Sequence, residues 1–143
     1  MAVGKCLFPV FSQSSQTFSA QFLSVSNMSE HQRQAFAEVY ERAKVLQAKK
    51  CHDGAIKELT KLLELSENIK NEEDLPKVLI ARAWNDRGHL KYLQVDFYGA
   101  VVDFSQAILL DNEFAVPFYN RGQIHYRMGM YKCNYKTLYL FLR

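Results

Sequence analysis

The sequence predicts an all-α fold, a short solenoid in which two to three helical hairpins stack on one another. The first observation is a motif that returns after 34 residues with the same spacing. It reads Ala81-x-x-Trp84-x-x-Arg87-Gly88-x-Leu90-x-Tyr92 and then Ala115-x-x-Phe118-x-x-Arg121-Gly122-x-Ile124-x-Tyr126. The second is the series of apolar residues between the copies, which recur at helical steps as Phe97, Ala100, Phe104, Ala107 and Leu110. Similarity at one fixed offset is typical of helical repeats, in which each unit buries its apolar face against a neighbour.

Residues 1–28 are predicted to form a disordered leader in front of a folded domain of residues 29–143. The leader contains one Lys, no Arg and no acidic residue. Its short apolar stretch is interrupted by Pro9, whereas a secretory signal needs a longer uninterrupted stretch. A mitochondrial presequence needs several Arg residues. We therefore expect neither targeting signal in this segment.

The first hairpin is predicted between Glu30 and Leu65. The apolar face of its first helix consists of Phe36, Val39, Tyr40, Ala43 and Leu46. A break at Lys49–Gly54 precedes a second amphipathic stretch that begins at Ala55. With Phe36 as position 1, the first unit covers residues 36–65 and retains the small residues of the motif but few of its aromatic residues.

A polar loop over residues 66–74 separates the first unit from the second. The offset between these two units is 45 residues in place of 34, which implies an insertion of 11 residues between them. The next helix is expected from about Leu75 to Gln94, with Asp74 as its N-cap and Pro76 in its first turn.

The remaining helices follow from their end signals. Asp96 is in position to cap a helix from Phe97 to Leu110, which completes the second unit, 81–114. A helix with Pro117 in its first turn then ends at Met128, before Gly129 at the C′ position. It opens the third unit, 115–143, which is incomplete: its last residues either form one more amphipathic helix or are irregular.

With Ala81 as position 1, nearly every signature position of the tetratricopeptide repeat is filled, and the chain resembles that family. The signature residues of the second unit are Trp84, Gly88, Tyr92, Phe97, Ala100, Phe104, Ala107 and Leu110, while Asn112 stands where the family usually has Pro. The resemblance implies stacked antiparallel hairpins. Gly88 and Ala100 would then let paired helices approach closely, and the aromatic residues would fill the space between hairpins.

Over roughly residues 30–130 the chain is similar to a small three-repeat member of that family. This finer similarity rests on Asn85-Asp86-Arg87-Gly88, on Val95-Asp96-Phe97-Tyr98, and on Asn112-x-Phe114-x-Val116-Pro117-x-Tyr119-Asn120-Arg121-Gly122. Such a member would complete its third hairpin with an acidic, Ala-containing helix and a polar tail. Because both ends of the chain depart from this pattern, we expect a variant or truncated form.

The charge distribution disfavours a nucleic-acid-binding protein. The net charge is +3, but all 15 acidic residues and 14 of the 18 basic residues lie within 30–129, so that this part carries −1. A nucleic-acid interface needs a clustered basic surface. No run of roughly 18 apolar residues occurs, so no membrane span is predicted.

Neither a metal site nor a catalytic site is predicted. The cysteines, Cys6, Cys51 and Cys133, are too far apart for a disulfide framework or a paired ligand motif. The four histidines have no ligand spacing with cysteines or acids, and no Ser or Cys has a base at a recognisable spacing. We expect reduced thiols, no cofactor, no enzymatic activity, and a location in the cytoplasm or the nucleus rather than secretion.

The candidate functional surface is the concave side of the stack, which the first helix of each hairpin would line. The candidate peptide-binding residues at positions 2, 5, 9, 12 and 13 are Arg82, Asn85, His89, Tyr92, Tyr119, Gln123, Tyr126 and Arg127, with Tyr40, Lys44 and Gln47 in the first unit. Rigid aromatic side chains can anchor a peptide and amides can bond to its backbone. For Tyr92 and Tyr126 the alternative is a packing role.

We therefore expect a non-enzymatic interaction module that binds a peptide or protein. The resemblance implies that relatives which bind chaperone carboxyl-terminal tails have Asn and basic residues where this chain has Asp86, Val116 and Asn120, so no binding of such tails is expected. One alternative is a structural protein whose aromatic segment, Tyr135–Phe141, caps the stack or drives weak self-association. Another is a poorly folded truncated isoform.

Overall fold

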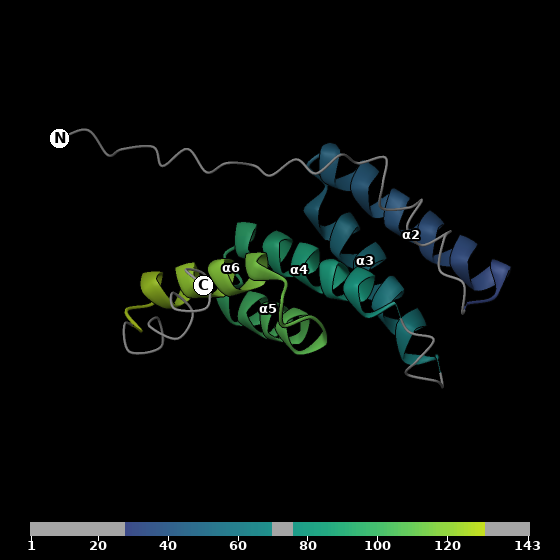
Figure 1. Ribbon diagram of the computed structural model, residues 1–143. Helices are drawn as coiled ribbons and strands as arrows, with labels where there is room; N and C mark the ends of the chain where they lie inside the picture. The colour runs from purple at the N-terminus through teal and green to yellow at the C-terminus, as the bar shows by residue number, and fades with distance from the viewer. Residues whose placement is uncertain (1–27, 70–75, 131–143) are drawn as a thin grey trace.

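The computed structural model describes residues 28–69 and 76–130, and this part of the chain is helical throughout, without strands (Figure 1). Its helices are α2 (Glu30–Ala48), α3 (His52–Glu67), α4 (Lys77–Leu93), α5 (Phe97–Leu110) and α6 (Ala115–Arg127). The predicted all-α class is confirmed. The leader up to residue 27, the Asp74 cap, Cys6, Cys133 and the aromatic segment after residue 130 lie outside the described residues.

Helix α2 begins with a capping box at Ser29. The Ser29 hydroxyl accepts a hydrogen bond from the Gln32 backbone N–H at 3.2 Å, and the Gln32 side chain accepts one from the Ser29 N–H at 3.1 Å. These reciprocal bonds satisfy two N–H groups that have no partner within the helix. Met28 is 5% exposed and belongs to the core of the first hairpin. The folded part therefore includes Met28, which we expected to be the last residue of the leader.

The break between α2 and α3 is shorter than predicted. Only residues 49–51 interrupt the helices, with Lys50 in the left-handed region at φ 58°, and Gly54 lies inside α3. A Cβ at Gly54 would lie 3.0 Å from the sulfur of Cys51 and 3.3 Å from Leu46. Gly54 therefore permits close contact at the start of a helix and does not end one. Helix α3 also continues through Ser66, which we expected in the loop.

The signals for α4, α5 and α6 are largely correct. Helix α4 begins at Lys77 with Pro76 as its N-cap, so Pro76 precedes the first turn rather than lying within it. The Asp96 carboxylate accepts a hydrogen bond from the Gly99 N–H at 2.9 Å, as predicted for a cap of α5. Gly129 follows α6 with a positive φ of 71°, the conformation expected at a C′ glycine.

Successive helices pack as hairpins, α2 against α3 and α4 against α5, and α6 packs against α5 (Figure 1). Gly88 lies in a close contact between α4 and α5. A Cβ there would be 3.0 Å from the ring of Phe104 and 3.1 Å from the Cβ of Asp103. Ala100 and Phe104 of α5 are buried in the same interface. The small residue at position 8 thus permits the close approach that the sequence predicted.

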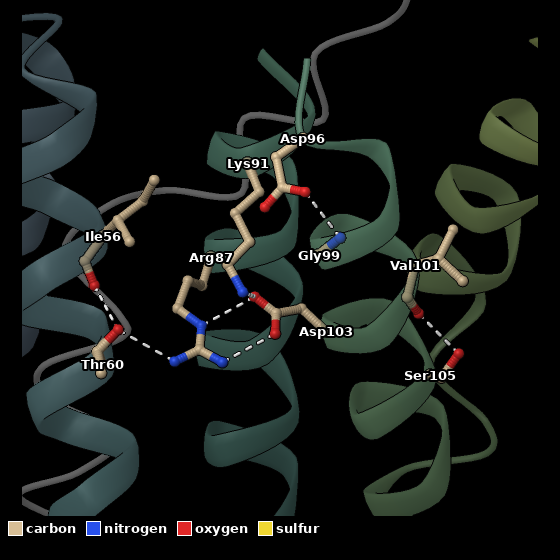
Figure 2. A network of polar contacts seen from close by, with 9 residues as sticks. All are labelled: Ile56, Thr60, Arg87, Lys91, Asp96, Gly99, Val101, Asp103 and Ser105. Carbon is tan, nitrogen blue, oxygen red and sulfur yellow. Dashed lines mark hydrogen bonds and ion pairs between the residues drawn. The ribbon is translucent and has the colours of Figure 1, made fainter. Parts of the chain in front are cut away.

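One polar contact recurs between consecutive hairpins. Thr60 of α3 donates its hydroxyl hydrogen to the carbonyl oxygen four residues earlier at 2.8 Å and accepts a hydrogen bond from Arg87 of α4 at 3.0 Å (Figure 2). Ser105 of α5 donates in the same way at 2.7 Å and accepts from Arg121 of α6 at 3.0 Å. The hydroxyls occupy position 25 of their units and the arginines position 7. Helix α4 therefore contacts α3 through the same pair of positions as α6 contacts α5.

Candidate functional site

The helices that begin the three units, α2, α4 and α6, are joined by a second recurring contact. Tyr40 of α2 donates a hydrogen bond to the Asp86 carboxylate of α4 at 2.8 Å. Asn120 of α6 donates to the side-chain oxygen of Asn85 on α4 at 3.1 Å. Each bond links position 5 of one unit to position 6 of the next. The candidate peptide-binding residues therefore lie on helices that are adjacent in space.

Asn85 does not have the exposure expected of a peptide-binding amide. It is 7% exposed, and its side-chain oxygen accepts the bond from Asn120. Its role in the structure is to connect α4 with α6. The sequence predicted that Asn85 faces the concave side, but its local pattern did not reveal the burial of this side chain or its bond to α6.

The Tyr92 ring contacts side chains of three helices, α4, α5 and α6. Its ring stacks with that of His89 at a centroid distance of 6.4 Å and lies 5.7 Å from that of Phe97. The guanidinium carbon of Arg127 lies 5.4 Å from the Tyr92 centroid, within range of a cation–π interaction. The structure thus brings together three candidate residues: His89, Tyr92 and Arg127. Tyr92 also packs against Phe97, which agrees with the packing role that was the alternative to peptide binding.

The other candidates on α6 are more accessible. Tyr126 is 64% exposed, and Tyr119 is exposed as well. Gln123 is half-buried and donates a hydrogen bond to the Tyr119 hydroxyl at 2.8 Å. Arg82 of α4 is half-buried. This surface offers aromatic faces, one amide and the Arg127 guanidinium to a ligand.

Burial favours the neutral forms of two titratable side chains near Asp86, those of His89 and Tyr40. His89 is an exposed residue, but partial burial of its ring lowers its pKa. Asp86 opposes this effect, and His52 and Lys44 add to it. Burial raises the pKa of the Tyr40 hydroxyl far above its ordinary value, and Asp86 raises it further. Lys44 lies 3.7 Å from the Asp86 carboxylate. His89 is therefore an uncharged imidazole at neutral pH, beside a carboxylate that already has two partners.

A shallow open depression lies elsewhere, along α2. It is lined by Gln34, Ala37, Glu38, Glu41 and Arg42. It does not coincide with any candidate residue. Among residues 28–69 and 76–130, no group of three His, Cys, Asp or Glu side chains is arranged to hold a metal ion. No helix within the same ranges is long and apolar enough to cross a lipid bilayer.

A buried charge network between α4 and α5 was not predicted from the sequence. Arg87 donates two hydrogen bonds of 2.8 Å to the carboxylate of Asp103, and Lys91 lies 2.9 Å from the same carboxylate (Figure 2). The Arg87 guanidinium also stacks over Trp84 at 4.5 Å. A signal for this network was available, because Arg42 and Glu58 repeat the 16-residue spacing of Arg87 and Asp103 and bond at 3.0 Å.

Comparison of the chain with known proteins yields no family assignment: no protein-family model and no solved structure matches it.

Proposed function

We propose that this chain is a tetratricopeptide repeat protein, a short solenoid of stacked hairpins that acts as a non-enzymatic interaction module. Two independent contacts support this proposal. The hydroxyl at position 25 meets the arginine at position 7 of the next unit twice, through Thr60 and Ser105. Position 5 bonds to position 6 of the next unit twice, through Tyr40 and Asn85. Contacts that recur with the sequence offsets are what a stack of equivalent units requires.

The proposed ligand is a peptide segment that lies along α4 and α6. The observation that carries this part is the group formed by His89, Tyr92 and Arg127, with Tyr126 exposed on the same helix as Arg127. Aromatic faces can hold an apolar side chain with little loss of conformational entropy, and a guanidinium can bond to peptide carbonyl or carboxylate oxygens. We propose that the protein acts in the cytoplasm or the nucleus.

Chaperone carboxyl-terminal tails are not among the proposed ligands. Asp86 occupies the position where relatives that bind such tails have Asn, and it already accepts a hydrogen bond from Tyr40. An additional carboxylate near Asp86 would be repelled. Calorimetric titration with a chaperone tail peptide should show no binding at micromolar concentration, and a micromolar dissociation constant would contradict this proposal.

Proximity labelling in cells tests the module. The experiment compares the wild-type chain with a His89→Ala/Tyr126→Ala variant and with a Lys57→Ala/Lys61→Ala control, which alters two exposed residues of α3. We expect a set of proteins that both the wild type and the control label, and that the His89→Ala/Tyr126→Ala variant no longer labels. An identical set of labelled proteins for all three chains would reject the proposed groove.

A second candidate function is self-association, and an exposed apolar stripe on α5 favours it. Tyr98, Val102 and Leu109 are exposed on the side of α5 that does not face α4. Size-exclusion chromatography with light scattering distinguishes the candidates. A monomer agrees with the interaction module, and a stable dimer that Val102→Asp dissociates supports the structural alternative. A non-cooperative thermal transition would favour the third alternative, a poorly folded isoform.

A further inference from the structure

The arginine at position 7 is present in all three units, as Arg42, Arg87 and Arg121. In the first two units it binds a carboxylate on the second helix of its own hairpin. Arg42 bonds to Glu58 at 3.0 Å, and Arg87 makes two bonds of 2.8 Å to Asp103. In both units the acid follows the arginine by 16 residues. A carboxylate is therefore the regular partner of this arginine.

In the third unit the arginine keeps its other contacts without a carboxylate. The Arg121 guanidinium lies 5.9 Å from the ring of Phe118, as that of Arg87 lies over Trp84, and it donates to Ser105 at 3.0 Å. Its Nε atom, however, is buried and has no hydrogen-bond partner. The corresponding Nε of Arg87 is one of the two atoms that bind Asp103.

His125, one helical turn after Arg121, also stands at the position of a residue that contacts Asp103. It stands 34 residues after Lys91, which contacts the Asp103 carboxylate at 2.9 Å. The Nδ1 atom of His125 is buried and without a hydrogen-bond partner. Within the described part of the chain, Nε of Arg121 and Nδ1 of His125 are the buried side-chain polar atoms without a hydrogen-bond partner. Both occupy the positions of the two cations that bind Asp103.

The chain itself has no acidic side chain at the matching position. The residue 16 positions after Arg121 is Thr137, and residues 131–143 contain Lys132, Lys136 and Arg143 but no Asp or Glu. Burial lowers the pKa of Arg121, and burial together with the charge of Arg121 lowers the pKa of His125. Buried polar groups without partners are costly, so a ligand that supplies the missing acceptor gains that free energy on binding.

We propose that Arg121 and His125 form a receptor for an Asp or Glu side chain on an amphipathic helix of a partner protein, which packs against α6 as α5 packs against α4. The buried face of α5 shows what this helix needs: Ala100, Asp103, Phe104 and Ala107. The partner helix therefore carries the pattern small-x-x-acid-apolar-x-x-small. Gly122 stands at the position of Gly88, the glycine at which α4 and α5 are in close contact. This site is separate from the proposed peptide groove, because it uses different side chains of α6.

The probe is a peptide of residues 96–111 of this chain, with blocked ends, because that sequence already presents the required face. It is compared with the same peptide carrying Asp103→Asn. A short helix is only marginally stable in water, but both peptides bear the same ordering cost, so their affinity ratio isolates the carboxylate. Fluorescence anisotropy with the full chain should give a dissociation constant at least about tenfold lower for the acidic peptide, in line with a charge-assisted pair.

The variants of the chain assign this preference to the two nitrogens. Arg121→Gln should reduce the preference for the acidic peptide to less than about twofold, while Arg121→Lys, which keeps the charge but loses the planar fork, should retain part of it. His125→Gln should reduce it about threefold. Lys57→Gln, an exposed charge removed from α3, should leave it unchanged. Circular-dichroism melts establish that each variant is folded.

Three results would overturn the proposal. One is equal affinity of the two peptides for the wild-type chain, which would show that no carboxylate is recognised. Another is an absence of binding by either peptide up to its solubility limit. The third is a preference that survives Arg121→Gln in a folded variant, which would place the carboxylate elsewhere. Because the first two use only the wild-type chain, they do not depend on how any variant folds.

Discussion

Arg87 binds both carboxylate oxygens of Asp103, with its Nε and Nη2 atoms each 2.8 Å from an oxygen. Asp103 is completely buried (0% exposed), and Lys91 lies 2.9 Å from the same carboxylate. Arg87 also reaches Thr60 on α3, so one side chain connects three helices. A buried carboxylate of this kind is tolerated only with its full set of partners, because the loss of one partner leaves an uncompensated charge.

Asp103→Asn should therefore be strongly destabilising. It leaves Arg87 and Lys91 without their counter-charge, and the free energy of unfolding should fall by about 3–5 kcal/mol. Urea denaturation followed by circular dichroism measures the change. Glu113→Gln, an exposed acid in the turn before α6, is the control and should change the free energy by less than about 0.5 kcal/mol. A loss below about 1 kcal/mol for Asp103→Asn would mean that the network contributes little.

Gly88→Ala tests the close approach of α4 and α5. The added Cβ would lie 3.0 Å from the Phe104 ring, so the packing must shift at a cost of about 1–3 kcal/mol. In a Phe104→Leu background the same substitution should cost less, because the flexible leucine can move away. Urea denaturation of the wild type, the two single variants and the double variant gives the coupling energy between positions 88 and 104. Equal costs in both backgrounds would show that the ring of Phe104 does not limit this site.

Asp96→Ala tests the cap of α5. The Asp96 carboxylate accepts the Gly99 N–H, and loss of such a cap costs about 1 kcal/mol. In a domain of this size the midpoint of thermal denaturation should fall by roughly 4–8 °C. Asp96→Ser can form the same bond and should retain most of the stability. If the alanine and serine variants melt together, the cap has no measurable role.

Stability at alkaline pH should depend on Tyr40. Burial, with Asp86 nearby, holds the pKa of Tyr40 in the folded state well above its ordinary value of 10.0. Above about pH 10 the unfolded chain releases this proton and the folded chain keeps it. The contribution of Tyr40 to stability is therefore complete below pH 10 and falls as the pH rises, by about 1.4 kcal/mol per pH unit.

Tyr40→Phe removes this dependence. Urea midpoints of the wild type and the variant, measured between pH 8 and pH 11, should converge as the pH rises, because only the wild type loses the Tyr40 contribution. At pH 8 the variant should be less stable by about 1 kcal/mol, since Asp86 loses the hydrogen bond from the phenol. Parallel pH profiles for the two chains would contradict the assignment of this titration to Tyr40.

The sequence predicted the helices well because their apolar spacing and end signals are local. Asp96 and Gly129 could be assigned from their neighbours alone. Gly54 was misjudged because its reason for being glycine is a contact with Cys51 and Leu46, not a local turn. The burial of Asn85 depends on how α6 lies against α4, which no local pattern contains.

Among the site residues, too, some positions could be predicted from the sequence and others depend on contacts in space. The sequence placed His89, Tyr92 and Arg127 on helices that do prove to be adjacent, although Arg127 follows Tyr92 by 35 residues along the chain. It did not predict that Arg121 and His125 repeat the positions of Arg87 and Lys91 without the acid. That inference needs the Asp103 contacts in space as well as the 34-residue offset.

The central claim is that α6 stacks on α5 in the same way as α4 stacks on α3. Two double-mutant cycles test it directly: Thr60→Val with Arg87→Gln, and Ser105→Ala with Arg121→Gln. Both pairs meet at 3.0 Å, so each cycle should give a coupling energy of about 0.5–1.5 kcal/mol, while the mismatched pair Thr60→Val with Arg121→Gln should be additive. Coupling in only one matched pair, or equal coupling in the mismatched pair, would contradict the claim that the hairpins are equivalent.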